Sequence, residues 1–294
     1  MTETVPSKPP LGGQALIEGV MMRDPTGWTA AARRPDGGIE TTEGTLPRWA
    51  AWFRPIPIAR GAAALVETIA VGLRALRWSA SVDTGDTEDP VTNRRLALTT
   101  AVTLAVFVGV FALLPATLAR AFTALTGWDG AFVVAEAVIR LGLFLAYVAL
   151  IGRSPAIRRT FEYHGAEHMV IAADEHDEAP TVAAARRYSV RHARCGTDFL
   201  LLVVVLAIVV FGVVGDTSWP VLVATRVIGL PVVAGLAYEV LRLARRWPNS
   251  RLVALVVSPG LAVQALTTRE PDDGQIEVAL AALVALREGS SLRH

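Results

Sequence analysis

The sequence predicts a mainly α-helical membrane protein with about four transmembrane helices and an α+β portion on one side of the bilayer. Hydrophobic residues make up 52% of the 294 residues and charged residues 19%, against about 45–50% and about 25% in ordinary soluble domains. The apolar excess is concentrated in four stretches long enough to span a bilayer. Arginine residues gather on one side of these stretches, and this asymmetry predicts their orientation.

Four apolar stretches are predicted to span the membrane, since a spanning helix needs about 20 mainly apolar residues. The first contains no charge and the third is almost wholly Leu, Val, Ile and Phe, so neither has the polar face of a soluble bundle helix. Charged residues occur only in the second, with Glu136 and Arg140, and in the fourth, with Arg226 and Glu239. The stretches cover residues 96–118, 131–151, 199–214 and 220–241.

Arginine placement predicts that both termini and the central loop are cytosolic, because cytosolic loops carry an excess of basic residues. Arginines precede the first span, follow the second and follow the fourth, whereas the two outer loops contain only Arg120. The predicted organisation is a cytosolic N-terminal block (1–95), a transmembrane hairpin (96–151), a cytosolic loop (152–198), a second transmembrane hairpin (199–242) and a cytosolic C-terminal block (243–294).

Charge and cysteine content exclude some classes of protein. With 28 basic and 27 acidic residues the net charge is only +1, so no overall positive field favours nucleic acid as a partner. Cys195 is the single cysteine, which excludes an intramolecular disulfide and suits a reducing compartment. The expected partners are the lipid bilayer and an unknown substrate or protein near the membrane.

The N-terminal block is predicted to contain a small antiparallel β element and one amphipathic helix. Residues 14–23 and 28–34 are predicted strands, and the turn Pro35-Asp36-Gly37-Gly38 leads into a return strand at 39–43. Apolar residues at helical spacing predict a helix over 57–80 that lies on the membrane surface or packs on the cytosolic part. The acidic stretch 83–89 is predicted to be a solvated linker.

The C-terminal block contains two further predicted helical segments. Residues 251–266 are apolar but interrupted by Ser258-Pro259-Gly260, which predicts a half-buried or re-entrant segment. Residues 275–287 have the periodicity of an amphipathic helix.

The residues with the clearest chemical potential lie in the central loop. His164-Gly165-Ala166-Glu167-His168 is an H-x-x-E-H pattern, which places two imidazoles on one helix face and a carboxylate beside the second. Downstream, His192 and Cys195 offer another nitrogen and the only thiol. Four protein ligands make a closed structural zinc site, whereas three leave a position for water, with Glu167 as the base. The alternative is that these histidines cap helices or pair with nearby carboxylates.

Two other segments offer possible supporting residues. The glycine-rich segment 11–23 lacks the phosphate-loop pattern, but Glu18 is a possible metal carboxylate and Arg23 a possible anion ligand. The alternative is a tight turn into a buried strand. In the segment 267–277, Glu270 and Glu277 are possible further ligands, and the alternative role for Thr268 or Asp273 is to cap adjoining segments.

These motifs together resemble the YqhQ-like family of bacterial membrane proteins, a domain of unknown function described as predicted metal-dependent enzymes. The resemblance runs from about Gly12 to Arg287, although Met169 and Ala193 stand where the family often has Lys and Pro. It implies a multi-spanning protein of the bacterial plasma membrane with a cytosolic metal-type site, and it does not imply a substrate. The matching segments are GGQALIEGVMMR (12–23), RGAAALVETIAVGLRAL (60–76), YHGAEHMV (163–170), HARCGTDFL (192–200) and SPGLAVQALTTREPDDGQIEVALAAL (258–283).

Three functions follow as hypotheses from the sequence. The first is a metal-dependent hydrolase at the cytosolic membrane face, in which His164 and His168 bind a divalent metal, most plausibly zinc, with His192 or Cys195 as third ligand. The second is a membrane scaffold or assembly factor with a structural metal site. The third is a transporter, for which the charged residues of the spans would have to line a cavity.

Overall fold

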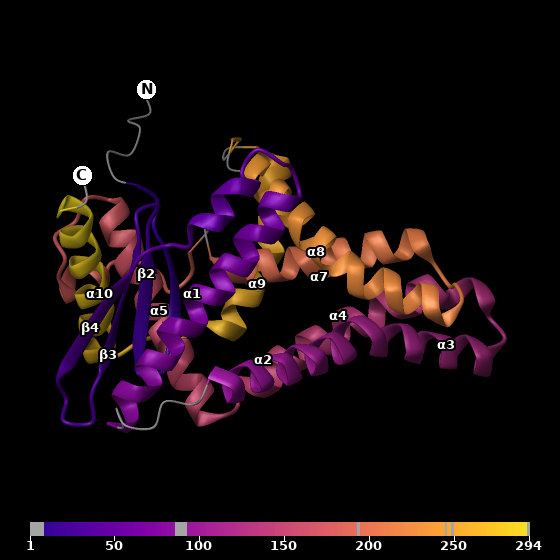
Figure 1. Cartoon of the computed structure of the whole chain (residues 1–294), viewed down its shortest axis with the longest axis horizontal. Helices are drawn as coiled ribbons and strands as arrows, with labels where there is room; N and C mark the ends of the chain where they lie inside the picture. Colours follow the sequence, from indigo (N-terminus) through magenta and orange to yellow (C-terminus); the bar gives the residue numbers. More distant parts are fainter. Residues whose placement is uncertain (1–8, 86–92, 193–194, 245, 248–249, 293–294) are drawn as a thin grey trace.

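The computed structural model describes residues 9–85, 93–192, 195–244, 246–247 and 250–292. A bundle of long apolar helices projects from a part of the chain that contains a four-stranded sheet (Figure 1). We call the four long apolar helices the bundle, and the sheet with the helices packed on it the sheet portion. The expected fold class, mainly α-helical with four spans and a small antiparallel sheet, is confirmed.

Four helices in the described part of the chain are long and apolar enough to cross a membrane. Large apolar side chains point outward along them, among them Val102, Val138 and Val209, and such side chains suit contact with lipid. The chain is therefore a membrane protein. The first span runs through α2 (Asn93–Val108), the π-helical turn η2 (Gly109–Leu113) and α3 (Leu114–Thr126); the others are α4 (Phe132–Ile151), α7 (Gly196–Val214) and α8 (Trp219–Ala244).

The first span is longer than predicted, because Arg120 lies inside the helix rather than in a loop. Its guanidinium donates hydrogen bonds to the Asp216 carboxylate, one of them at 2.7 Å, and to the Thr217 carbonyl. It also lies 4.6 Å from the ring centroid of Trp219, within cation–π range. These contacts compensate the charge, and the helix continues until Gly127 ends it with a left-handed conformation (φ 65°).

The sheet is an antiparallel meander with the strand order β1-β2-β3-β4. The predicted strand over 14–23 is in fact two strands, because the chain reverses at Ile17 and Glu18 and Leu16 pairs with Gly19. The expected turn at 35–38 joins the third strand to the fourth, where Arg33 pairs with Ile39. The strands are β1 (Gly12–Leu16), β2 (Gly19–Arg23), β3 (Trp28–Arg33) and β4 (Ile39–Gly44).

Helices cover both faces of this sheet, so its central strands are buried on both sides (Figure 1). Successive side chains of a strand point to opposite faces. Val20 and Met22 therefore join a core with α5 (Pro155–Glu175) and α10 (Asp273–Leu292). Met21, on the opposite face, joins a second core with α1 (Ala59–Thr84).

The helix α1 connects the sheet to the bundle. This helix was predicted either to lie on the membrane surface or to pack on the cytosolic part. Its residues Val71 and Ala75 pack on the sheet, while Val66 and Ile69 remain exposed. At its start, Arg60 donates a 2.6 Å hydrogen bond to Glu239 of α8. The helix includes the first two residues of the predicted linker, 83 and 84, so the linker prediction is wrong there, and residues 86–89 lie outside the described residues. Short helices complete the chain: η1 (Arg48–Phe53), η3 (Asp129–Ala131) and α6 (Val182–Ala185).

The apolar C-terminal segment forms a single helix, α9 (Arg251–Thr267), which continues through Pro259. The expected interruption at 258–260 is therefore not observed. Gly260, directly after Pro259, has to be a glycine, because a Cβ atom at this position would overlap the Asp198 carboxylate of α7. The following helix, predicted over 275–287, is α10 and extends further at both ends.

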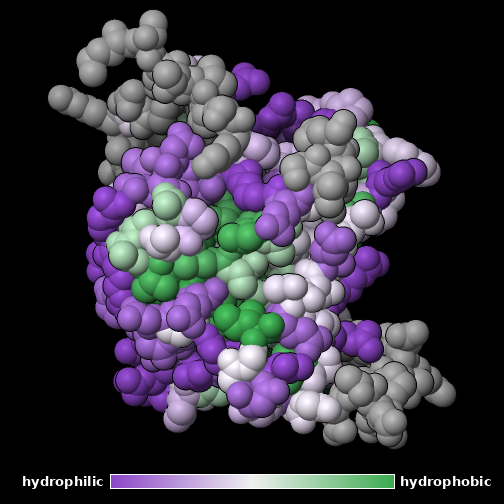
Figure 2. Space-filling view, turned by 90° about the vertical axis from the view of Figure 1, so that its left-hand side faces the viewer, coloured by the Kyte–Doolittle hydropathy of each residue, from purple (hydrophilic) through white to green (hydrophobic). Residues whose placement is uncertain are grey.

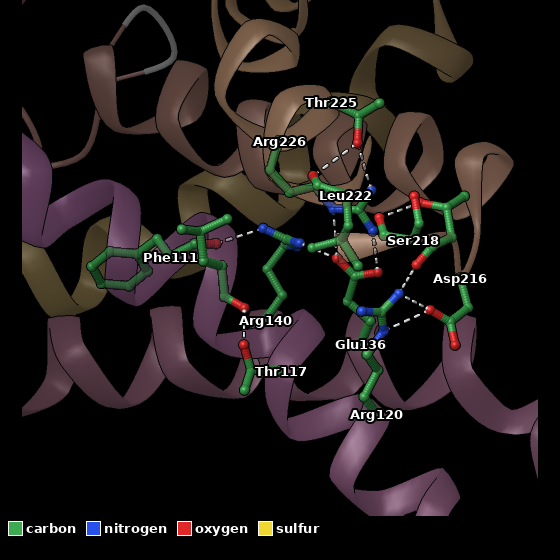
Figure 3. Close-up of polar contacts among 12 residues, drawn as sticks. Phe111, Thr117, Arg120, Glu136, Arg140, Asp216, Ser218, Leu222, Thr225 and Arg226 are labelled. Atoms are coloured by element: carbon green, nitrogen blue, oxygen red, sulfur yellow. Dashed lines mark hydrogen bonds and ion pairs between the residues drawn. The ribbon is translucent and has the colours of Figure 1, made fainter. Parts of the chain in front are cut away.

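A charged cluster in the bundle interior joins all four spans (Figure 3). The Glu136 carboxylate of α4 accepts a hydrogen bond from Arg140 at 2.5 Å and from Arg226 of α8 at 2.7 Å. Arg140 also donates to the Phe111 carbonyl in η2 at 2.5 Å. Both guanidinium groups lie over the ring of Phe211 in α7, at 5.0 and 4.7 Å from its centroid.

We expect Glu136→Gln to lower the free energy of unfolding by about 3–5 kcal/mol, because one carboxylate compensates two buried guanidinium groups. Thermal unfolding of the purified protein in detergent measures the change. Glu40→Gln, at an exposed position of β4, is the matched control and should leave stability unchanged. Equal unfolding temperatures for the two variants would contradict this role of Glu136.

Candidate functional site

The H-x-x-E-H motif lies on α5, the central helix of the sheet portion. The helix begins with Pro155 in its first turn, where a proline costs no hydrogen bond. It is buried nearly all round from Tyr163 to Asp174. Gly165 is needed there, because a Cβ atom at this position would overlap the carbonyl oxygen of Arg269, which crosses the helix.

Both histidines of the motif are oriented by backbone carbonyl groups. Nδ1 of His164 lies 2.8 Å from the Thr267 carbonyl oxygen, and Nδ1 of His168 lies 2.6 Å from the Val190 carbonyl oxygen. Since a carbonyl only accepts hydrogen bonds, each Nδ1 carries the proton and each Nε2 keeps a lone pair. A hydrogen bond from one ring nitrogen to a backbone carbonyl is typical of histidines whose other nitrogen binds a metal.

Cys195 completes a cluster with these two histidines. Its Sγ lies 3.2 Å from Nε2 of His164, and one ligand atom from each of His164, His168 and Cys195 falls within 4.8 Å of the others. Cys195 is also the N-cap of α7, where Sγ accepts a hydrogen bond from the Thr197 backbone N–H at 3.3 Å. Burial raises the pKa of the Cys195 thiol, and the bonds from Thr197 oppose that rise.

His168, the second histidine of the motif, has a ring nitrogen without a hydrogen-bond partner in the described part of the chain. His168 is only 2% exposed, and its Nε2 has no hydrogen-bond partner among the described residues. Burial lowers the pKa of His168 to about 3, so the imidazole is neutral near pH 7 and its lone pair is available. A buried nitrogen of this kind needs a partner.

Glu167 lies against the first strand of the sheet. Its side chain is buried, and a Cβ atom at Gly13 of β1 would overlap its carboxylate. Burial raises the pKa of Glu167 to about 7, and the nearby His164 opposes this rise. The charges of His164 and Cys195 influence this carboxylate, so it lies near the cluster, although it is not one of the three grouped side chains.

His192, also predicted as a ligand, lies beside the cluster but outside the group of three. Its Nε2 is 3.2 Å from a carboxylate oxygen of Glu175, and its ring centroid is 5.8 Å from that of His168. Gln264 of α9 holds its backbone at both ends, accepting from the His192 N–H at 3.1 Å and donating to the His192 carbonyl at 2.9 Å.

Two further residues of this region, Asp198 and Gln264, were not singled out from the sequence. Gln264 is fully buried and donates a 3.0 Å hydrogen bond to Oδ1 of Asp198. Oδ2 of Asp198 has no partner among the residues that the structure describes. The sequence does contain a signal for Asp198. It is a single carboxylate three residues after Cys195, at the start of an otherwise uncharged span. Gln264 had no comparable signal, since its role depends on chain segments distant in sequence.

The predicted supporting residues of the glycine-rich segment lie elsewhere. The carboxylate of Glu18 forms an ion pair with Arg159 and accepts a 3.2 Å hydrogen bond from the Tyr163 hydroxyl. Arg23 donates a 3.2 Å hydrogen bond to Thr68 of α1. The structure therefore brings neither side chain into the His/Cys cluster, and the expected tight turn at Glu18 is observed.

The segment after α9 contains capping groups rather than additional members of the cluster. Glu270 is exposed, and Glu277 pairs with Arg33 at 3.2 Å. Asp272 caps α10, where the sequence suggested Asp273. Its carboxylate accepts from the Gln275 N–H at 2.7 Å, and the Gln275 side chain accepts from the Asp272 N–H at 2.9 Å. This reciprocal pair is a capping box.

His176, on the same helix as His164 and His168, lies outside the group of three. His176 ends α5, bonds to the Ala172 carbonyl at 2.7 Å and stacks against Tyr188. His294 lies outside the described residues.

The three grouped side chains have the donor chemistry of a zinc site. Zinc binds imidazole nitrogen and thiolate sulfur, and three protein ligands leave one position open in a tetrahedral site. Two observations fit this set: Nε2 of His168 lacks a partner in the described part of the chain, and Nε2 of His164 lies close to Cys195. Oxygen-preferring cations such as magnesium fit it poorly.

Two surface cavities lie on the sheet portion, away from the three grouped side chains. One, of about 370 Å³, has mainly apolar walls contributed by α5 and α10, including Val170, Leu280 and Leu283. The face of the molecule on the side of α10 shows a hollow with hydrophobic residues inside a hydrophilic rim (Figure 2). The other, of about 500 Å³, is lined by charged residues, among them Arg34 and Arg159.

The fold and the cluster define a multi-spanning membrane protein with a His/His/Cys group beside the start of a span. The model of a protein family of unknown function, DUF1385, matches residues 56–288. The uncharacterized protein YqhQ of Bacillus subtilis (strain 168) is 34% identical over 290 residues, covering 92% of this chain and 90% of the relative. The chain belongs to this family, as its motifs predicted. No solved structure matches it.

We expect Gly13→Ala to destabilise the protein by about 1–3 kcal/mol, because the added methyl group would overlap the buried Glu167 carboxylate and force it to shift. The matched control is Gly12→Ala, whose Cβ would lie 3.7 Å from the Arg23 side chain, an ordinary contact. Thermal unfolding of both variants measures the difference. A destabilised Gly12→Ala with an unaffected Gly13→Ala would show that Glu167 is not packed in this way.

Proposed function

We propose that the protein is a metal-dependent hydrolase whose site lies at the cytosolic face of the membrane. One observation carries the proposal: the buried Nε2 of His168, which has no hydrogen-bond partner among the residues that the structure describes, lies in the same group as the donor atoms of His164 and Cys195. Buried polar atoms without a partner are rare in proteins. Zinc bound by these three residues would supply that partner.

The proposed ligands are His164, His168 and Cys195, with His192 as a neighbour. A zinc ion held by three protein ligands lowers the pKa of a bound water to about 7. The Nδ1 hydrogen bonds of both histidines to backbone carbonyls keep each Nε2 unprotonated and directed inward. Thr197 holds the thiol of Cys195 through its backbone and hydroxyl groups.

Glu167 is the proposed general base. Its carboxylate is buried beside His164 and Cys195, and packing against the backbone at Gly13 limits its movement. A fixed carboxylate at this position can take a proton from an attacking water and deliver it to a leaving group. The substrate class that suits this arrangement is an amide or ester close to the membrane surface.

The proposed location follows from the arginine distribution. The sheet portion is continuous with the ends of the spans that have arginine-rich flanks, and such flanks face the cytosol. Cys195 lies directly before the span α7, so the site would be at the bilayer surface. Together with the relative in Bacillus subtilis, this favours the bacterial plasma membrane, with both termini cytosolic.

A structural metal site in a scaffold protein is the second candidate. It is favoured by the position of the ligands, since Cys195 caps a span while His164 and His168 belong to the sheet portion. A metal between them would join the two parts. The transporter hypothesis lacks such support, because Glu136, Arg140 and Arg226 bond with one another in the bundle interior.

We expect the purified wild-type protein to retain about one zinc ion per chain, and His164→Ala and His168→Ala, singly or together, to lose it. His176→Ala is the control, because His176 lies outside the cluster. His192→Ala tests whether His192 is a ligand, and we expect this variant to retain zinc. Elemental analysis of protein purified without added chelator is the measurement. Wild-type protein without stoichiometric metal, or double-variant protein with unchanged metal, would refute the site.

We expect Glu167→Gln to retain zinc but to lower the rate constant kcat for ester or amide hydrolysis by about 10²-fold or more, because the amide cannot accept a proton. A panel of small chromogenic esters and amides, assayed with the zinc-loaded protein, is the measurement. Equal hydrolysis by wild type and Glu167→Gln would exclude the proposed base. A zinc-loaded wild type without hydrolysis of any panel member would favour the scaffold.

A further inference from the structure

The charged cavity of the sheet portion brings together side chains from four separate segments. Its volume is about 500 Å³, and its walls include three arginines, Arg33, Arg34 and Arg159, and two carboxylates, Glu18 and Asp83. Arg33 is the last residue of β3, Arg34 follows it, and Arg159 comes from α5. The lining therefore holds three guanidinium groups and two carboxylates on one concave surface, where such charges act together, and Asp36 and Glu277 pair with Arg34 and Arg33 from beside it.

The arginines retain hydrogen-bond donors that the protein does not use. Arg159 binds Glu18 through Nε and Nη2, and Arg34 approaches Asp36 through Nε at 3.4 Å. Within the described part of the chain, Nη1 of Arg159 and both Nη atoms of Arg34 have no hydrogen-bond partner. Guanidinium groups donate forked pairs of hydrogen bonds, which match the oxygens of phosphate better than a single ammonium does.

The third arginine is fixed in place and shapes the wall. Arg33 donates to the Gly37 carbonyl at 2.9 Å and to the Gly274 carbonyl at 2.7 Å. It also pairs with Glu277 at 3.2 Å. These bonds connect the β3–β4 turn to the start of α10, so the cavity wall is built before any ligand arrives.

Glu18 indicates that the cavity is a constrained part of the fold. Its backbone is in the left-handed region (φ 49°), which is uncommon for a residue other than glycine and is concentrated at functional sites. The Arg33 N–H donates to its carbonyl at 2.8 Å, and Arg159 and Tyr163 bind its carboxylate. The Glu18 carboxylate thus occupies Nε and Nη2 of Arg159, and Nη1 is the donor that this arginine offers to a further ligand.

The cavity lies close to the membrane. The span α4 ends at Ile151, and α5 begins at Pro155. Arg159 follows in the second turn of α5, about 6 Å further along the helix axis. Asp83 lies at the end of α1, and the chain next enters the first span. In Figure 1 the lower end of α1 and the β3–β4 turn lie on the side where α2 enters the bundle.

We propose that this cavity binds a phosphate group through Arg34 and Arg159. The group is either the headgroup phosphate of an anionic lipid in the adjacent leaflet or a free phosphate compound, since both present the same oxygens to the guanidinium groups. The site shares no side chain with the His/His/Cys cluster, so phosphate binding does not depend on whether that cluster binds a metal.

Full-length protein in a non-ionic detergent tests the proposal. One arm titrates inorganic phosphate, and the other titrates dihexanoyl phosphatidylglycerol, with bound ligand counted by native mass spectrometry. We expect one saturable site, and a dissociation constant at least about tenfold higher in Arg34→Gln and in Arg159→Gln, since each loses charged hydrogen bonds. Binding of phosphate alone identifies a free phosphate compound, and binding of the lipid alone identifies a headgroup.

The control is Arg48→Gln, an exposed arginine before α1, which should bind like wild type. Arg34→Gln is the decisive variant, because Arg34 is half exposed and its loss leaves the Glu18 pair intact. Unfolding temperatures verify that each variant is folded. Saturable binding in neither arm, or wild-type binding by Arg34→Gln, would overturn the proposal.

Discussion

The arrangement of the spans depends on the carboxylate of Glu136. A buried arginine in an apolar helix bundle requires a counter-charge, since an isolated charge in a medium of low dielectric constant is very costly. Glu136 supplies it to Arg226 and to Arg140, and Arg140 in turn binds the Phe111 carbonyl. The ring of Phe211 contacts both guanidinium groups. One acidic side chain therefore orients four helices, and apart from the contacts of Arg120 with Asp216 and Thr217 the packing between these helices is mainly apolar.

The His/Cys cluster depends on this packing, because its members extend from the same spans. The span α4 leads into α5 with His164 and His168, and Cys195 is the residue on which α7 begins. Gln264 connects α9 to α7 through Asp198. A displacement of these helices along their axes would therefore separate the thiol from the imidazoles. The chemistry of the site is local, but its geometry is set by the bundle.

Sequence alone predicts those features that depend on neighbours along the chain. Apolar runs located the spans, and the four-residue spacing placed His164 and His168 on one helix face with Cys195 as a further donor. Contacts between distant segments were not accessible. The burial of Gln264 between a loop and a span, the helical position of Arg120, and the pairing of Glu18 with Arg159 each require the folded chain. Hydropathy predicts the length of a membrane helix well only where the helix contains no charged residue, such as Arg120, whose charge is compensated by a partner in the folded chain.

The π-helical turn Gly109–Leu113 interrupts the first span without bending the chain out of the bundle. Such a turn holds one residue more than an α-helical turn. Deletion of that extra residue would rotate the rest of the helix by about 100° about its axis. Arg120 would then leave Asp216 and Trp219, while the Phe111 carbonyl would lose its place opposite Arg140. The second half of this span can therefore accept changes of residue type far more readily than the insertion or deletion of a single residue.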